Sequence, residues 1–195
     1  MTIKGIIFDM DGTIVDAPYD WDLIRSELDT QGKPILSYLQ GLPEPQKSSK
    51  WAVLEGFEER ATQQADLKAG VPELLGFLRR HRIKIALVSN NSQKNIMFLL
   101  NKYQLIFDRV MSRETGLWKP SAEPFLQVLQ EWGISAEECC AVGDSVFDIL
   151  AAQAAEIDRV YIVNRDHARF QEYSVEVFAT FAQLQGQFEH LLHST

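Results

Sequence analysis

Short apolar runs alternate along this chain with longer stretches of helical spacing, and most of the apolar runs end in a polar turn. Nearly continuous apolar runs are typical of strands that are covered on both faces. We expect strands at Ile3–Phe8, Ile83–Val88, Arg109–Met111, Cys139–Val142 and Arg159–Val163. The helices expected between and after them are Val71–His81, Gln93–Tyr103, Ser121–Trp132, Val146–Ala155 and Phe181–Leu192. This alternation predicts an α/β fold with a doubly wound parallel sheet, whose ligands bind at the carboxyl ends of the strands.

One interval interrupts the alternation. Between Val15 and about Gly70 no buried strand is evident, whereas Tyr19–Leu28 and Ser49–Ala65 have helical spacing. A structureless loop of that length is uncommon in a compact domain. We therefore expect a small α-helical subdomain over the site at residues 16–70, inserted in a core domain made of residues 1–15 and 71–195.

Composition and charge limit the classes of function. The chain has 195 residues, 46% of them hydrophobic, which suits one globular domain with a small insert. Its formal net charge of −8 argues against a nucleic-acid partner. No apolar run approaches the roughly 20 residues that span a bilayer, so we expect no membrane partner. The start of the sequence does not fit a signal peptide, and the adjacent Cys139 and Cys140 cannot easily bridge the fold. These features favour a cytoplasmic location.

Two carboxylates follow the first expected strand directly, in the segment Asp9-Met10-Asp11-Gly12-Thr13. Both side chains reach the ligand edge of the sheet if the chain bends there, and Gly12 permits that bend. Like charges this close repel one another unless a cation or a proton intervenes. Taken alone, the segment also fits an acidic loop without a ligand.

The later strand ends carry polar groups as well. Ser89-Asn90-Asn91-Ser92 offers a hydroxyl and backbone N–H groups at a helix start, which either seat a phosphate or cap the helix. Lys119-Pro120 supplies either a buried cation or an ordinary surface charge. Gly143-Asp144-Ser145-Val146-Phe147-Asp148 places two more acids on one face of a starting helix, where the helix dipole also favours them. Together these strand ends provide the groups needed to bind Mg²⁺ and a phosphoryl group.

The order and spacing of these groups resemble the haloacid dehalogenase-like (HAD) hydrolase superfamily over nearly the whole chain. The segments similar to its four motifs are Asp9 to Asp16, Ser89, Lys119-Pro120, and Gly143 to Asp148. The helical insert resembles the cap of the phosphoglycolate-phosphatase-like branch, although it is short for that branch. Ala122 also departs from the pattern, because relatives often carry a second proline there.

The resemblance implies a Rossmann-like core and a phosphomonoester hydrolase that depends on Mg²⁺ and uses an aspartyl-phosphate intermediate. Its implied substrate is a small phosphorylated metabolite, a small-molecule phosphate ester. Asp9 is the implied nucleophile. Asp11 is implied to protonate the leaving oxygen and later to deprotonate the attacking water.

The resemblance also implies which residues hold the ligands. The metal group is Asp9, Asp11 through its backbone carbonyl, and Asp144, with Asp148 supporting them. The phosphate group is Ser89, Asn90 and Lys119.

Other functions remain open at this point. A phosphomutase of the same superfamily shares the same core residues and returns the phosphoryl group to a sugar. A receiver domain of a signalling protein also uses a diacid, a hydroxyl and a lysine, but it lacks a helical insert and places its acceptor aspartate after a later strand. A non-catalytic phosphate-binding protein is opposed by the filled catalytic positions, and a dehalogenase by Asp11. The sequence leaves the choice between monomer and homodimer undetermined.

Overall fold

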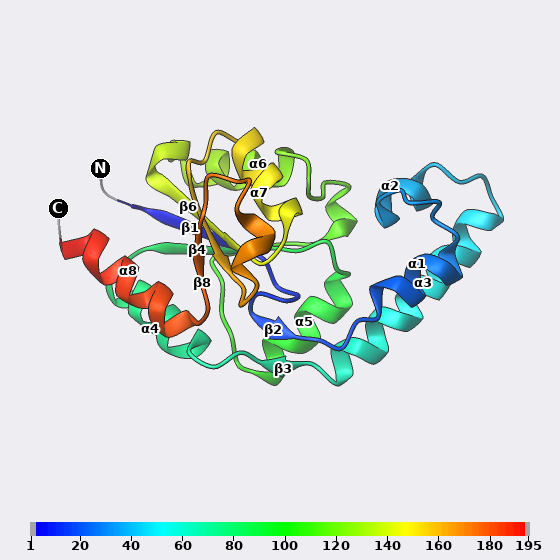
Figure 1. Cartoon of the computed structure of the whole chain (residues 1–195), viewed down its shortest axis with the longest axis horizontal. Coiled ribbons are helices and arrows are strands. Elements are labelled where there is room, and N and C mark those ends of the chain that lie inside the picture. Colours follow the sequence, from blue (N-terminus) through cyan, green and yellow to red (C-terminus); the bar gives the residue numbers. More distant parts are fainter. Residues whose placement is uncertain (1–2, 194–195) are drawn as a thin grey trace. The chain divides into compact units, whose positions relative to one another are not determined.

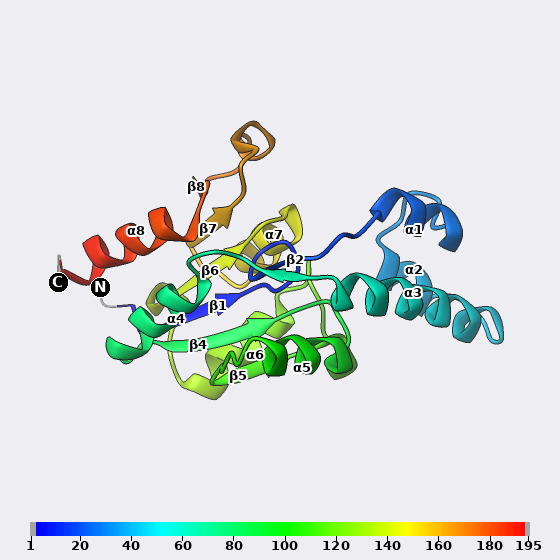
Figure 2. The ribbon, with the colours of Figure 1, turned by 90° about the horizontal axis from the view of Figure 1, so that it is seen from below.

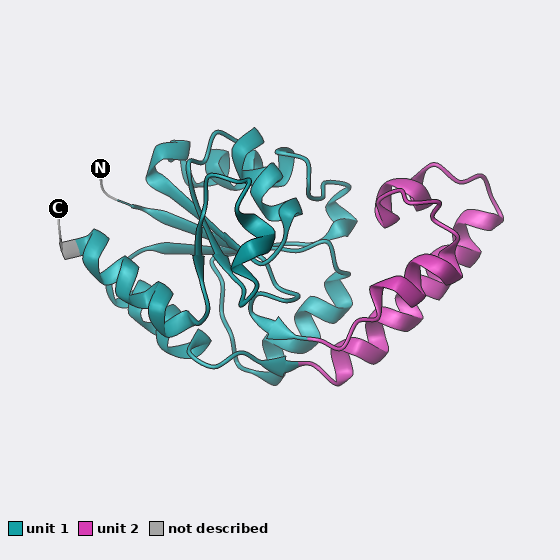
Figure 3. Cartoon of the chain, in the orientation of Figure 1, with its two compact units in different colours: residues 1–16, 66–195 teal, residues 17–65 magenta. Residues whose placement is uncertain are grey.

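The computed structural model describes residues 3–193, which divide into two compact units (Figure 3). The α/β unit comprises the chain up to Asp16 and from Asp66 onward, and the helical unit comprises residues 17–65. The sequence placed the insert at 16–70, slightly wider. The difference arises because Val15–Asp16 (β2) and Asp66–Leu67 (β3) pair as short antiparallel strands that belong to the α/β unit.

Within the described residues, a six-stranded sheet forms the centre of the α/β unit (Figure 1). Its strands are β1 (Gly5–Phe8), β4 (Lys84–Val88), β5 (Arg109–Met111), β6 (Cys139–Gly143), β7 (Arg159–Val163) and β8 (Glu176–Phe178). All neighbouring strands are parallel, in the order β5-β4-β1-β6-β7-β8. The predicted doubly wound α/β fold is therefore confirmed.

The register of the central strands brings the polar strand ends together. Phe8, the last residue of β1, pairs with Leu87 of β4 on one side and with Val142 of β6 on the other. The residues that follow these strands therefore leave the sheet at the same edge. The chain order reverses across β1, and such a switch point is where ligands bind in doubly wound sheets.

Helices cover both faces of the sheet (Figures 1 and 2). In the α/β unit they are α4 (Val71–Arg80), α5 (Gln93–Lys102), α6 (Glu123–Trp132), α7 (Val146–Ala154) and α8 (Phe181–His193), with short 3₁₀ turns at Arg113–Thr115, Ala136–Glu138 and His167–Phe170. Helices α6 and α7 pack on one face, where their Phe125, Val128 and Ile149 bury Ile7 of β1. Helices α4 and α8 contact one another on the opposite face. Burying each large apolar side chain contributes about 1.5–3 kcal/mol, so this core holds the strand ends firmly in place.

The helical unit contains α1 (Trp21–Leu28), α2 (Ile35–Gln40) and α3 (Gln46–Gln63). Helix α1 begins at Asp20, whose carboxylate accepts a hydrogen bond from the N–H of Leu23 at 2.9 Å. Its side chains Ile24 and Leu28 are buried, and α1 contacts α3. None of the helices described is long and apolar enough to cross a membrane.

Candidate active site

The segment after β1 is a tight loop that buries Asp9. The N–H groups of Thr13, Ile14 and Val15 all donate to the carbonyl of Met10, which folds the loop back on itself. The hydroxyl of Thr13 lies 3.2 Å from Oδ2 of Asp9 and 3.4 Å from Oδ1 of Asp144. The fully buried Thr13 thus bridges the first and last expected motifs.

Gly12 allows Asp144 to approach this loop. Its φ of +82° lies in the region that L side chains rarely adopt. A Cβ at this position would lie 2.2 Å from Oδ2 of Asp144. The glycine is therefore required both by the backbone conformation and by the carboxylate next to it.

Asp11 is held from the end of β4. The side-chain amide of Asn91 donates to its Oδ2 at 3.0 Å, and the hydroxyl of Ser89 lies 3.5 Å from the same oxygen. Ser89 is buried and also accepts a hydrogen bond from the N–H of Asn91 at 3.1 Å. Ser89 and Asp11, which the sequence placed in separate roles, are therefore neighbours.

Lys119 lies in the interior with its ammonium between two carboxylates. Its Nζ contacts Oδ1 of Asp9 and lies 2.7 Å from Oδ1 of Asp148. Asn90 fixes the lysine backbone from both sides, because its amide donates to the Lys119 carbonyl at 2.8 Å and accepts from the Lys119 N–H at 2.9 Å. Both polar atoms of the Asn90 side chain are thus engaged with the Lys119 backbone.

Asp148 lies in the first turn of α7 and contributes its carboxylate to the site. Its Oδ2 accepts hydrogen bonds from the N–H of Asp144 at 3.2 Å, the N–H of Ser145 at 3.0 Å and the Ser145 hydroxyl at 2.7 Å. This arrangement satisfies backbone N–H groups at the start of the helix. Asp148 therefore orients the Asp144 backbone and holds Lys119 at the same time.

Burial and mutual repulsion govern the charges in this site. Burial raises the pKa of Asp9 well above its usual value, Lys119 lowers it, and Asp148 and Asp144 raise it further. Burial and Asp148 raise the pKa of Asp144 to about 6, although Lys119 and Lys68 oppose the change. Burial lowers the pKa of Lys119, but Asp148 and Asp9 more than offset this and raise it above its usual value. The Lys119 ammonium therefore does not fully compensate the carboxylates of Asp9, Asp144 and Asp148.

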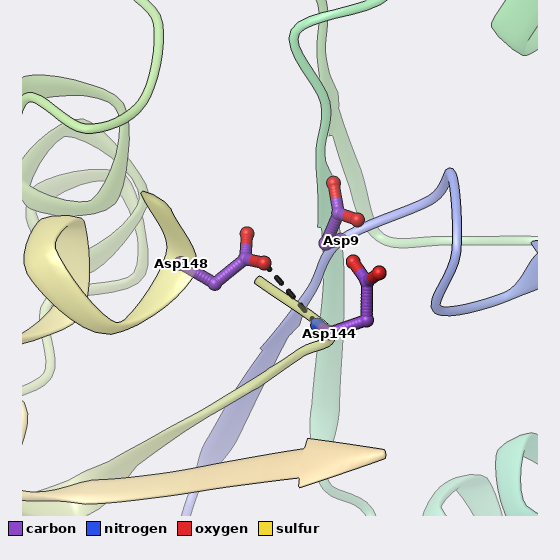
Figure 4. A group of neighbouring side chains, drawn as sticks. All are labelled: Asp9, Asp144 and Asp148. Atoms are coloured by element: carbon purple, nitrogen blue, oxygen red, sulfur yellow. Dashed lines mark hydrogen bonds between the residues drawn. The ribbon is translucent and has the colours of Figure 1, made fainter. Parts of the chain in front are cut away.

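The donor set fits a hard divalent cation. Among the described residues, Asp9, Asp144 and Asp148 each offer a carboxylate oxygen, and these oxygens lie within 4.8 Å of one another (Figure 4). Mg²⁺ prefers oxygen ligands of this kind. A divalent cation here would relieve the repulsion that raises the pKa of Asp9 and Asp144.

Three residues of the site, Lys68, Asn91 and Thr13, were given no role of their own by sequence reasoning. Lys68, in the segment after β3, donates through Nζ to the Gly12 carbonyl and lies 3.2 Å from Asp16. Asn91 stands in the expected phosphate segment, but nothing in the sequence indicated that its side chain faces Asp11. Thr13 was part of the first expected motif without a role of its own.

Comparison with known proteins identifies the family. Residues 23–162 match the family model described as haloacid dehalogenase-like hydrolase. The chain belongs to this family. The match covers more than half of the chain and confirms the expected HAD membership.

Curated relatives of this HAD chain include phosphatases. It is 30% identical over 186 residues to the phosphorylated carbohydrates phosphatase of Thermotoga maritima, covering 82% of this chain and 84% of that protein. It is 27% identical over 162 residues to a haloacid dehalogenase-like hydrolase domain-containing protein of Arabidopsis thaliana, covering 76% of this chain and 66% of the relative, just under two thirds of its length. Phosphoglycolate phosphatases are also among the relatives. These matches confirm the phosphoglycolate-phosphatase-like branch and the expected enzyme class, a HAD-like phosphatase.

Solved structures share the fold of this HAD chain. A hydrolase from Pseudomonas syringae aligns with a TM-score of 0.79 over 96% of this chain and 98% of its own, at 19% identity. At that identity the likeness shows the fold alone. It extends over the whole α/β arrangement that positions the strand ends.

Proposed function

We propose that the chain is a Mg²⁺-dependent phosphomonoester hydrolase that forms an aspartyl-phosphate on Asp9 and acts on a small phosphorylated metabolite. The observation that carries the proposal is the placement of Asp9. Its buried carboxylate follows β1 at the switch point of the sheet, between the Lys119 ammonium and the Asp144 carboxylate. A buried carboxylate beside the Lys119 ammonium, at the edge where parallel sheets bind ligands, supports the role of a nucleophile toward phosphorus.

The proposed reaction has two halves, in which Asp9 and Asp11 keep the roles that the family resemblance implies. A carboxylate oxygen of Asp9 forms a bond to phosphorus as the ester P–O bond breaks, and Asp11 gives a proton to the departing alkoxide. In the second half, Asp11 takes a proton from water, the water oxygen bonds to phosphorus, and the bond from phosphorus to Asp9 breaks. Free Asp9 and inorganic phosphate result.

The phosphate needs positive charge and N–H or O–H donors in this acidic site. One unit-charge pair at about 4 Å repels by roughly 4 kcal/mol at an effective dielectric of about 20. Asp9, the Asp11 carbonyl and Asp144, supported by Asp148, would hold Mg²⁺, whose positive charge would offset that repulsion. Lys119, the Ser89 hydroxyl and the Asn90 N–H are the other groups that would bind the phosphate oxygens.

Hydrolysis of p-nitrophenyl phosphate by the purified protein tests this function. We expect turnover with Mg²⁺, loss of turnover with EDTA, and loss in Asp9→Asn. Asp158→Asn is the matched control, because it removes a carboxylate from an exposed position next to β7. Turnover in Asp9→Asn at the wild-type rate would exclude the proposed nucleophile.

The intermediate is tested separately. In Asp11→Asn, p-nitrophenolate still departs without a proton because it is a weak base, but water is no longer deprotonated. We expect the phosphorylated enzyme to accumulate, with the added phosphate found by mass spectrometry on the peptide that contains Asp9. Release of the phosphoryl group to an added sugar phosphate, in place of water, would indicate a phosphomutase.

A further inference from the structure

The side chain of Asn91 links Asp11 to the start of α5. Asn91 is buried, and its Nδ2 donates to Oδ2 of Asp11 at 3.0 Å. It lies two residues after Ser89, in the turn that leads from β4 into the helix. Its side chain therefore approaches Asp11 from a different element than the one that carries Asp11.

The orientation of this amide is fixed by its surroundings. Its Oδ1 accepts hydrogen bonds from the N–H of Ser92 at 2.7 Å and from the side-chain amide of Asn95 at 2.9 Å. Turning the amide over would place its NH₂ against these two donors and its oxygen against the Asp11 carboxylate. The donor is thus held facing Asp11.

The backbone of Asn91 is fixed as well. Its N–H donates to the Ser89 hydroxyl oxygen at 3.1 Å, and its carbonyl accepts from the N–H of Arg113 at 3.2 Å. Asn95, the residue behind the amide, is itself buried. Buried polar groups whose hydrogen bonds are satisfied on every side form rigid networks, so this donor keeps its place when the substrate changes.

We propose that Asn91 is a positioning residue that holds Asp11 for both of its proton transfers. The inference rests on the acid–base role proposed above for Asp11. An oxygen that accepts from Asn91 and Ser89 is the one that does not carry the proton, so the other carboxylate oxygen of Asp11 exchanges it with the leaving group and with water. The two asparagines then have different roles. The Asn90 side chain holds the backbone of Lys119, and the Asn91 side chain holds the carboxylate of Asp11.

The test compares two substrates that differ in their need for an acid. Nitrophenolate departs from phosphorus without a proton, whereas the more basic phenolate benefits from one. For Asn91→Ala we expect kcat/KM to fall about tenfold with phenyl phosphate and to change by less than about twofold with p-nitrophenyl phosphate. With p-nitrophenyl phosphate, kcat and KM should fall together, because the water attack that follows still needs Asp11 as base.

Two further variants separate positioning from folding. Asn95→Ala removes the support behind the amide while leaving Asn91 in place, so it should show the same pattern to a smaller degree. Asn101→Ala alters an exposed asparagine on the same helix and should match the wild type. All rates are measured well below the melting temperature of each variant.

The outcomes are distinct. Equal loss of kcat/KM with both substrates in Asn91→Ala would mean a structural role and would overturn the inference while leaving the phosphatase intact. Full activity of Asn91→Ala with both substrates would also overturn it. Absence of turnover in the wild type with both esters would remove the proposed function, and this inference with it.

Discussion

Lys119 Nζ lies 2.7 Å from Oδ1 of Asp148, while the other oxygen of the same carboxylate accepts hydrogen bonds from the backbone and side chain of Ser145. One buried carboxylate therefore joins the lysine that follows β5 to the turn that follows β6. Both side chains are almost fully buried. The position of the Lys119 ammonium in the site thus depends on Asp148 and on the start of α7.

Asp148→Asn should weaken both the fold and the activity. The amide keeps an oxygen for Ser145 but turns an NH₂ toward the Lys119 ammonium, so donor faces donor. We expect a loss of about 1–3 kcal/mol in the free energy of unfolding, measured by urea denaturation. Activity should fall about 100-fold, because Lys119 is displaced from its place beside Asp9.

The matched control is Glu131→Gln. Glu131 pairs with Arg109 at 2.7 Å in a half-exposed ion pair. Removing such a pair costs about 0–1 kcal/mol. If both variants lose the same stability, Asp148 does not have the structural role described above.

Lys119→Met should make the stability of the protein fall more steeply with rising pH than that of the wild type. Lys119 lowers the pKa of both Asp9 and Asp144, so its removal raises them further. A carboxyl whose pKa is raised in the folded state destabilises the fold increasingly as pH rises above its ordinary pKa of 3.8, so the stability lost in the variant should grow with pH from about pH 4 upward. Phosphatase activity should fall by about 10²–10³. Circular dichroism melts check the first effect, with the exposed Lys102→Met as the control; a pH-independent loss would contradict it.

Gly12→Ala and Gly116→Ala separate backbone strain from side-chain crowding. The two glycines have similar φ angles, +82° and +78°, but a Cβ on Gly116 would meet nothing within 4 Å. Both variants should lose about 1–2 kcal/mol of stability. Gly12→Ala should additionally displace Asp144 and weaken Mg²⁺ activation about 10–100-fold, seen as a shifted Mg²⁺ titration of activity. Identical titrations for the two variants would rule out the close approach of Asp144.

Mg²⁺ should stabilise the protein more at neutral than at acid pH. Without metal, the pKa of Asp144 is raised from 3.8 to about 6, so stability falls as pH rises through this window. Metal binding needs the ionised carboxylate and offsets that loss. The increase in melting temperature on adding Mg²⁺ should therefore be small near pH 5 and larger above pH 6. An increase that is the same across this range would contradict the prediction.

The sheet could be predicted from the sequence because its central strands are buried on both faces. Gly5–Phe8 and Cys139–Gly143 are apolar throughout, and parallel strands place the residues after them at one edge. Strand β8 was missed because Glu176–Phe178 is short, partly exposed and begins with a charged residue. Helix α2 was missed because Ile35–Gln40 is brief and lies among glycines and prolines.

The contacts within the site were less accessible to sequence reasoning. Spacing indicates which strand end carries a group, but not where its side chain points. Asn90 and Asn91 are adjacent and chemically identical, yet one fixes the Lys119 backbone and the other contacts Asp11. The turn that carries both residues is bonded to the end of β5, because the Ser89 N–H donates to the Met111 carbonyl and the Asn91 carbonyl accepts from the Arg113 N–H. Spacing along the chain does not reveal these contacts.

The antiparallel pairing of β2 with β3 has a consequence for how such a chain diversifies. Val15 pairs with Leu67 and Asp16 with Asp66, so residues 17–65 leave and return at adjacent points. Since closing a longer excursion between fixed ends adds little entropy cost, segments of different length and sequence can be grafted at this junction without re-threading the sheet. The length and sequence of residues 17–65 can therefore change while the strand ends that carry Asp9, Lys119 and Asp144 keep their positions in the sheet.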